Sequence, residues 1–233
     1  MKCREPILIE PFISGDYAHS WKDIDTNWQK VETQLRHLLW ILDTALPGEL
    51  GIIGEWVNQG EAFLMSEDEP VQFNEDSAAL LNQKIDDHKQ FFENYERTME
   101  QLKRWTSKPC EGVPEDQLKS LISRLHQIGP KSCKRGFHLK FLEHKCCILA
   151  FLNLTENKLR LWTRRCGNEE NVAHVLQQYK AFVSKNKIFQ EFHKAFLEFK
   201  DVSVDYKNNT NLSVNERTEI DRFIQVKFQL YQF

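Results

Sequence analysis

Residues 21–45 read WKDIDTNWQKVETQLRHLLWILDTA. Apolar side chains recur here at alternating steps of three and four residues, which places them along one face of an α-helix, whereas a strand would need a period of two. Eight positions share this apolar stripe: Trp21, Ile24, Trp28, Val31, Leu35, Leu38, Leu42 and Ala45. So narrow a stripe needs partner helices to bury it. The sequence therefore predicts a helix that packs against other helices.

The same periodicity recurs along the rest of the chain. It fills the segments 50–64, 78–102, 118–162, 172–199 and 223–233, which are separated by stretches containing proline, glycine or many polar residues. Residues 115–166 are expected to form one nearly continuous helix, bent at Gly129-Pro130 because a proline removes a backbone donor. Residues expected to be buried include Leu35, Ile85, Leu121 and Leu152. Because the last stripe is still continuing at Phe233, we expect the chain to be part of a longer protein.

Composition narrows the function classes. The chain has 233 residues, with 31 lysines and arginines against 34 acids, and this balance argues against a dedicated nucleic-acid binder. No apolar run approaches the roughly 18 residues of a membrane span, and the start MKCREPILIEPF lacks a signal-peptide pattern, so no membrane contact by this segment is expected. The six cysteines show no framework spacing and are expected to be reduced thiols of a cytosol-facing protein.

Candidate chemical sites are few. Cys133, His138, His144 and Cys147 are zinc-type ligands within 15 residues, but on a helix the two cysteines would be about 21 Å apart, so we expect no metal site. His88 interrupts an apolar stripe and is either a pH switch or, as we favour, a histidine at the core edge bonded to a neighbouring helix. No phosphate loop, HExxH or GxSxG occurs, so we expect no enzyme activity and no cofactor.

Charge and aromatic residues give hints of a binding surface. The 131–165 segment is basic within a net-acidic chain, and this pattern marks either a solvated helix face or a docking stripe for an acidic protein partner. The candidate protein-binding residues are Lys134, Arg135, Lys140, Arg160 and Arg164. Five phenylalanines between 182 and 199 are expected mainly in the core, and any that stays exposed would make an interface anchor.

Several stretches resemble a known family. Residues 85–91 align with 176–182 at an offset of 91, which indicates repeated three-helix units. The stretches IDTNWQKVETQL, LGIIGEWVNQGEAFL (50–64) and LLNQKIDDHKQFFENYERTMEQL (80–102) resemble helices of spectrin repeats. More specifically, HLKFLEHKCCILAFLNLTENKLRLW (138–162) and VLQQYKAFVSKNKIF (175–189) resemble the central rod of the giant nesprins, spectrin-repeat proteins of the outer nuclear membrane. Pro47-Gly48 and Gly129-Pro130 depart from the family by falling where helix should be unbroken.

The resemblance implies an all-α fold of tandem spectrin-like three-helix bundle repeats, elongated, with a shared long connecting helix. The expected division is an irregular leader (1–16), a helix of a preceding repeat (17–46), and repeats at 47–138 and 139–233. The implied function is a rod segment of a linker at the cytoplasmic face of the outer nuclear membrane. Its full-length protein would bind F-actin, and the segment would dock a cytoskeletal regulator, a FHOD-type formin. The alternatives are a cytoplasmic cytoskeletal crosslinker without a nuclear role, and a helical enzyme or ligand carrier using Cys and His.

Overall fold

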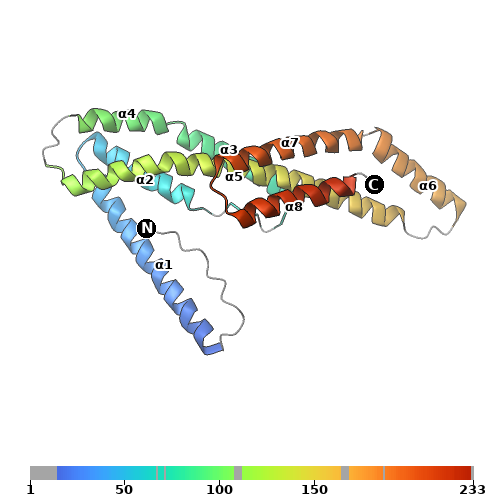
Figure 1. Ribbon diagram of the computed structural model, residues 1–233, viewed down its shortest axis with the longest axis horizontal. Coiled ribbons are helices and arrows are strands. Elements are labelled where there is room, and N and C mark those ends of the chain that lie inside the picture. Colours follow the sequence, from blue (N-terminus) through green and yellow to red (C-terminus); the bar gives the residue numbers. More distant parts are fainter. Residues whose placement is uncertain are drawn as a thin grey trace. The chain divides into compact units, whose positions relative to one another are not determined.

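A computed structural model describes residues 15–66, 68–70, 72–107, 112–163, 168–185 and 187–231 (Figure 1). Every regular element in these residues is helical, as the sequence predicted. The elements are α1 (Gly15–Thr44), α2 (Glu49–Leu64), α3 (Glu75–Phe92), α4 (Tyr95–Thr106), α5 (Glu115–Trp162), α6 (Glu169–Lys180), the π-helical turn η1 (Ala181–Lys185), α7 (Ile188–Asn209) and α8 (Val214–Tyr231). None of the helices so described is long and apolar enough to cross a membrane.

The predicted long helix is confirmed as α5, which has 48 residues and contains Pro130. At 1.5 Å per residue it is about 72 Å long. Gly129 has a packing role here, because a Cβ at this position would lie 2.6 Å from the Tyr95 hydroxyl oxygen. The phenol ring of Tyr95 therefore packs against the backbone of α5 beside the proline, and a side chain at residue 129 would force this ring to shift.

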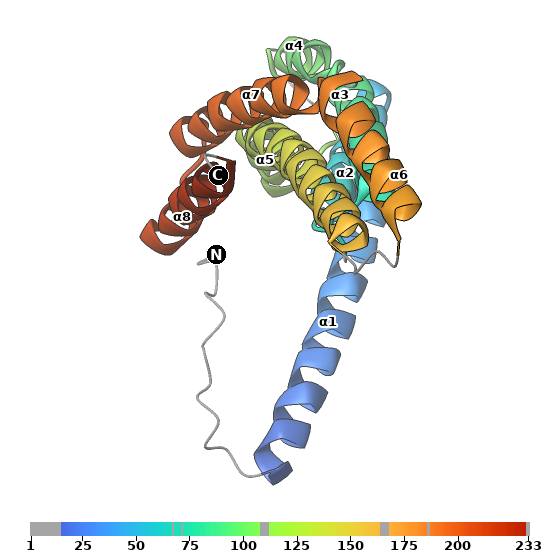
Figure 2. The same ribbon diagram turned by 90° about the vertical axis from the view of Figure 1, so that its right-hand side faces the viewer.

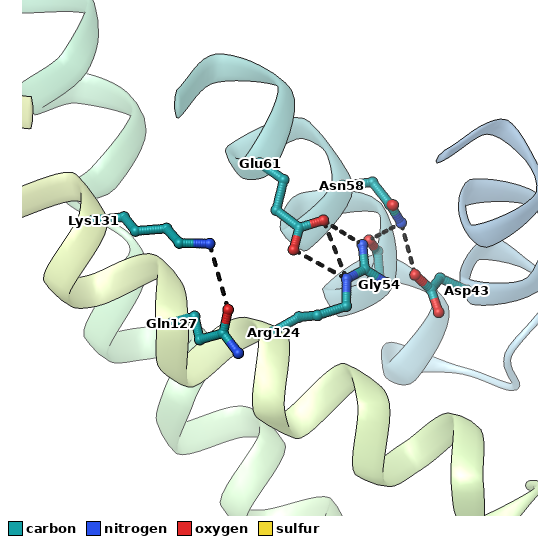
Figure 3. A network of polar contacts seen from close by, with 7 residues as sticks. All are labelled: Asp43, Gly54, Asn58, Glu61, Arg124, Gln127 and Lys131. Carbon is teal, nitrogen blue, oxygen red and sulfur yellow. Dashed lines mark hydrogen bonds and ion pairs between the residues drawn. The ribbon is translucent and has the colours of Figure 1, made fainter. Parts of the chain in front are cut away.

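The other expected break is a true interruption. The backbone turns after α1, and Gly48 adopts φ 59°, a left-handed conformation that glycine adopts without steric cost. Asp43, at the end of α1, is only 2% exposed and accepts a hydrogen bond from Asn58 of α2 at 2.9 Å (Figure 3). Pro47-Gly48 thus ends one helix and lets the next begin. A further break, at residues 93–94 between α3 and α4, interrupts the single helix expected over 78–102.

The chain packs as two compact units. The first contains Met1–Gln59 and Glu100–Ser123, and its described core is built from Leu46, Leu50, Ile53, Val57, Leu102 and Leu121. In the same unit, α1 leaves its apolar stripe in solvent, with Leu35 56% exposed. The prediction that Leu35 is buried is therefore wrong. The stripe is as apolar as expected, but no described residue covers it.

The second unit contains Gly60–Met99 and Arg124–Phe233. Its core joins α3, α5, α7 and α8, and α7 and α8 lie beside the C-terminal half of α5 in both views (Figures 1 and 2). Ring contacts hold these helices together: Phe141 lies 5.7 Å from Phe199, and Phe199 lies 5.5 Å from Phe223, centroid to centroid. The predicted burial of Ile85 is confirmed, and Leu152 packs against this core.

Candidate protein-binding surface

The structure places the five predicted binding residues in different environments. Lys134, Lys140 and Arg160 are exposed on α5, and Arg160 pairs with Glu156 at 2.7 Å. Arg164 lies outside the described residues. Arg135, in contrast, is only 7% exposed and belongs to the core of the second unit.

The buried position of Arg135 follows from its place on α5. The inward face of this helix repeats at steps of three and four residues, through Leu125, Ile128, Ser132, Arg135, Leu139, Leu142 and Cys146, all of which are buried. Counting steps of three and four residues from Leu125 places Arg135 on this inward face. The charge pattern, from which Arg135 was predicted to bind a partner, contains no such information.

The buried guanidinium pairs through Nε and Nη2 with residues of the segment before α3, while its Nη1 has no hydrogen-bond partner among the described residues. Arg135 donates from Nε and Nη2 to the two carboxylate oxygens of Asp68, at 2.8 and 2.7 Å, and from Nη2 to Ser66 Oγ at 2.8 Å. Its plane also lies 4.7 Å over the ring of Phe63. A bidentate arginine–carboxylate pair of this kind ties Asp68 to α5, and the contacts with Ser66 and Phe63 tie the end of α2 to the same helix.

A second arginine makes a similar link. Arg124 of α5 donates from Nε to both carboxylate oxygens of Glu61 on α2 at 3.1 Å, and from Nη2 to Oε2 at 2.7 Å (Figure 3). On the same helix, Lys131 bonds the side chain of Gln127 at 3.4 Å. Several basic side chains of α5 thus make contacts within the unit.

The remaining exposed cations do not share one face. Lys134 and Lys140 are six residues apart, which turns them about 120° from each other around the axis of α5, and Arg160 is about 39 Å along the helix from Lys134. A single compact partner patch cannot contact all three at once. They can still attract an acidic partner at a distance, because unpaired surface charges act over about 8–10 Å at physiological ionic strength.

His88 behaves as the core-edge residue we favoured. It is 8% exposed, bonds the backbone of Ser132 on α5, and lies 4.8 Å from the ring of Phe92. Burial, and then the positive charge of Arg135, lower the pKa of His88 from its ordinary value of 6.5, against smaller opposing effects of the Ser132 bond and Asp68. His88 is therefore neutral in the folded chain at neutral pH.

This lowered pKa predicts how stability depends on pH. Below about pH 6.5 the unfolded chain takes up a proton at His88 that the folded chain binds only at lower pH, so the free energy of unfolding should fall as the pH decreases. Urea denaturation from pH 7 to 5 should show a shallower fall for His88→Gln, by at most about 1.4 kcal/mol per pH unit for one proton. His174→Gln, an exposed control on α6, should keep the parent slope. Equal slopes for parent and His88→Gln would contradict the assignment.

The four zinc-type ligands do not converge. No group of three or more metal-ligating side chains capable of holding an ion occurs in the described residues. Instead, Glu143 binds His144 Nδ1 at 2.7 Å and accepts from the Cys147 thiol at 3.3 Å. Burial raises the pKa of Cys147 to about 12 and that of Cys146 to about 11. Both thiols therefore stay protonated and are poor nucleophiles at neutral pH.

The five phenylalanines between residues 182 and 199, expected mainly in the core, include both buried and exposed side chains. Phe192, Phe196 and Phe199 are buried, whereas Phe189 is 51% exposed at the start of α7. Phe182 packs edge-on against Trp162 at 5.4 Å, and the same indole contacts Tyr179 of α6 at 5.5 Å. Because α6 buries none of its own residues, these contacts at Trp162 are a main link between α6 and α5.

Comparisons with known proteins fit this helical architecture. A family profile described as "Nesprin-1, spectrin repeats" matches residues 151–228. Over 88% of its length the chain is 45% identical to muscle-specific protein 300 kDa of Drosophila melanogaster. The chain belongs to the nesprin family of spectrin-repeat proteins.

More distant nesprins match as well. Nesprin-2 of Homo sapiens is 22% identical over 78% of the chain, and nesprin-2 of Mus musculus is 23% identical over 76%. The sequence had suggested nesprin-2 in particular, but these values do not single out that member. The chain spans only 2–3% of the length of these relatives. No solved structure matches.

Proposed function

We propose that this nesprin-type segment is a non-enzymatic part of a linker between the outer nuclear membrane and actin, and that it docks a cytoskeletal regulator, a FHOD-type formin. The 45% identity over 88% of the chain to a nesprin-family protein carries the linker assignment. The formin and the contact with F-actin through the full-length protein come from the family resemblance. The thiols and histidines described above offer no nucleophile or metal centre, which favours a binding role over catalysis.

The exposed face of α1 supports a place within a longer array of repeats. Seven large apolar side chains of its stripe are 44–56% exposed: Trp21, Ile24, Trp28, Val31, Leu35, Leu38 and Leu42. A contiguous apolar face of this size is unusual on the surface of an isolated domain. We therefore propose that residues 17–46 belong to, or extend from, a preceding repeat, with further repeats at 47–138 and 139–233.

The exposed cations of α5 are the proposed steering residues. Lys134 and Lys140 have no acidic partner among the described residues, whereas Arg160 forms an ion pair with Glu156. Arg135 is no longer included, because Asp68 holds it in the core. Such charges raise the rate of encounter with an acidic surface more than they hold the final complex.

A charge reversal tests this role. Binding of the whole chain to the folded N-terminal region of a FHOD formin should weaken about three- to tenfold for the double variant Lys134→Glu/Lys140→Glu, mainly through the association rate, and its salt dependence should flatten. The matched control is Lys194→Glu/Lys200→Glu, which makes the same charge change on exposed positions of α7. Surface plasmon resonance at several salt concentrations measures both. Equal losses for the two variants would remove Lys134 and Lys140 from the interface, and no binding by the parent would remove the formin.

The second candidate is a spectrin-repeat segment of a cytoplasmic cytoskeletal crosslinker. The exposed α1 face suits this function equally, since any array of repeats would cover it. Imaging the full-length protein in cells separates the two: a rim around the nucleus supports the linker, and filament staining without a nuclear rim supports the crosslinker.

A further inference from the structure

We infer that a cavity of the second unit, between α5, α7 and α8, binds an arginine side chain presented by a protein partner. The cavity has a volume of about 480 Å³, and its lining includes Glu69, Lys134, His138, Tyr206, Glu219 and Phe223. This inference goes beyond the proposed function, because it needs neither the formin nor the exposed cations as steering residues.

Tyr206 forms an aromatic wall of the cavity. Its ring stacks with His138 at 5.4 Å and 14°, and with Phe141 at 5.0 Å and 20°. The residue is only 7% exposed, yet its hydroxyl has no hydrogen-bond partner among the residues that the structure describes. Tyr206 lines the cavity, so a ligand atom there can give its hydroxyl the hydrogen bond that no described residue supplies.

The charges around this hydroxyl favour a cation. Two carboxylates, those of Glu216 and Glu69, act on the Tyr206 oxygen: burial first, and then their negative charges, raise the pKa of Tyr206 to about 12. Glu216 is already engaged at the start of α8, where it accepts from the Ser213 backbone N–H at 2.7 Å. Glu69 and Glu219 form no ion pair with any described residue and remain available to a ligand.

The two lysines at the cavity offset part, but not all, of the negative charge of its carboxylates. The ammonium of Lys145 lies over three rings, 4.7 Å from the centroid of Phe73, 5.8 Å from that of Phe223 and 5.9 Å from that of Phe141. Its charge is thus engaged by cation–π contacts. The three carboxylates of Glu69, Glu216 and Glu219 against Lys134 and Lys145 leave one net negative charge on the lining when His138 is neutral, and burial lowers the pKa of His138.

The guanidinium of an arginine suits the Tyr206 hydroxyl and the carboxylates of this cavity better than the ammonium of a lysine. Its planar fork of N–H groups can bond a carboxylate and the Tyr206 phenol oxygen at the same time. Arginine is also among the residues that contribute most to protein interfaces when it enters a pocket. The occupant is therefore an arginine on the surface of a partner protein, not a free anion.

The test is an NMR titration of the whole chain with N-acetyl-L-arginine methylamide, followed at the Tyr ring and Ile methyl signals. We expect saturable shifts at Tyr206 and Ile220, and at least about fivefold weaker binding of the neutral citrulline analogue. Tyr206→Phe keeps the ring but loses the hydroxyl, and should weaken binding about three- to tenfold. Glu219→Gln, an exposed position, should act similarly.

Tyr179→Phe is the matched control, because Tyr179 is 43% exposed on α6 and does not line the cavity. It should bind like the parent chain. Three outcomes would overturn the inference: equal binding of the arginine and citrulline analogues, parent-like binding by Tyr206→Phe, or preferential binding of N-acetyl-L-aspartate methylamide. Circular dichroism of each variant checks that its helices are intact.

Discussion

Replacing Leu139 with alanine is expected to lower the free energy of unfolding by about 2–5 kcal/mol, as for other large-to-small changes in a packed core. Leu139 is 0% exposed on the inward face of α5. The cost has two parts, the lost transfer of the side chain from water and the cavity left between helices that cannot fully close it. Urea denaturation followed by circular dichroism measures it.

Leu35→Ala is the matched control for this prediction, because it makes the same substitution at a residue of α1 that is 56% exposed. It should change the stability of this chain by less than about 0.5 kcal/mol. A loss at Leu35 as large as that at Leu139 would mean that the α1 stripe is covered in solution, for instance by a second copy of the chain.

Arg135→Ala is expected to destabilise the second unit by about 3–5 kcal/mol, because it leaves a buried carboxylate without its partner. Asp68 accepts two short hydrogen bonds from Arg135, and Lys84 lies 3.7 Å away as a weaker second cation. Removing the arginine also exposes the ring of Phe63, over which the guanidinium lies. The loss therefore combines charge and packing.

Arg160→Ala provides the comparison for Arg135, since its pair with Glu156 is exposed on the same helix. It should cost less than about 0.5 kcal/mol. The double variant Arg135→Met/Asp68→Leu should recover much of the loss, because replacing both partners of a buried pair by apolar residues is often close to neutral. Similar midpoints for Arg135→Ala and Arg160→Ala in urea would contradict the burial of Arg135.

The difference between Arg135 and Arg160 shows where local sequence information ends. Both are basic residues on one helix, and net charge along the segment treats them alike. The three-and-four repeat does not distinguish them either, because steps counted on from Cys146 reach residue 160 as well. What sets Arg135 apart is its acidic partner, which the local sequence does not reveal, because Asp68 is 67 residues away and belongs to a segment without periodicity.

The cavity lined by Tyr206 could not be predicted from the sequence. Glu69, His138, Tyr206 and Glu219 come from separate segments, and none forms a motif with its sequence neighbours. Only the packing of α5 against α7, α8 and the segment before α3 brings them to one cavity. The same holds for Tyr95, whose ring lies so close to Gly129 that a Cβ there would force it to shift.

Helix periodicity was enough to predict the all-α fold and the nearly continuous helix across residue 130, and short motifs were enough to indicate the nesprin family. Proline and glycine at 47–48 indicated an interruption, which could have been a kink or a restart of the helix. These features depend on interactions within a few turns of the chain, where apolar spacing and backbone preference act directly. Which apolar faces are covered was decided by tertiary structure: α5 buries Leu139, whereas α1 leaves Leu35 in solvent. Both leucines lie on stripes with the same spacing, and burial requires another helix to lie against the stripe, a property of the packed chain that spacing does not contain.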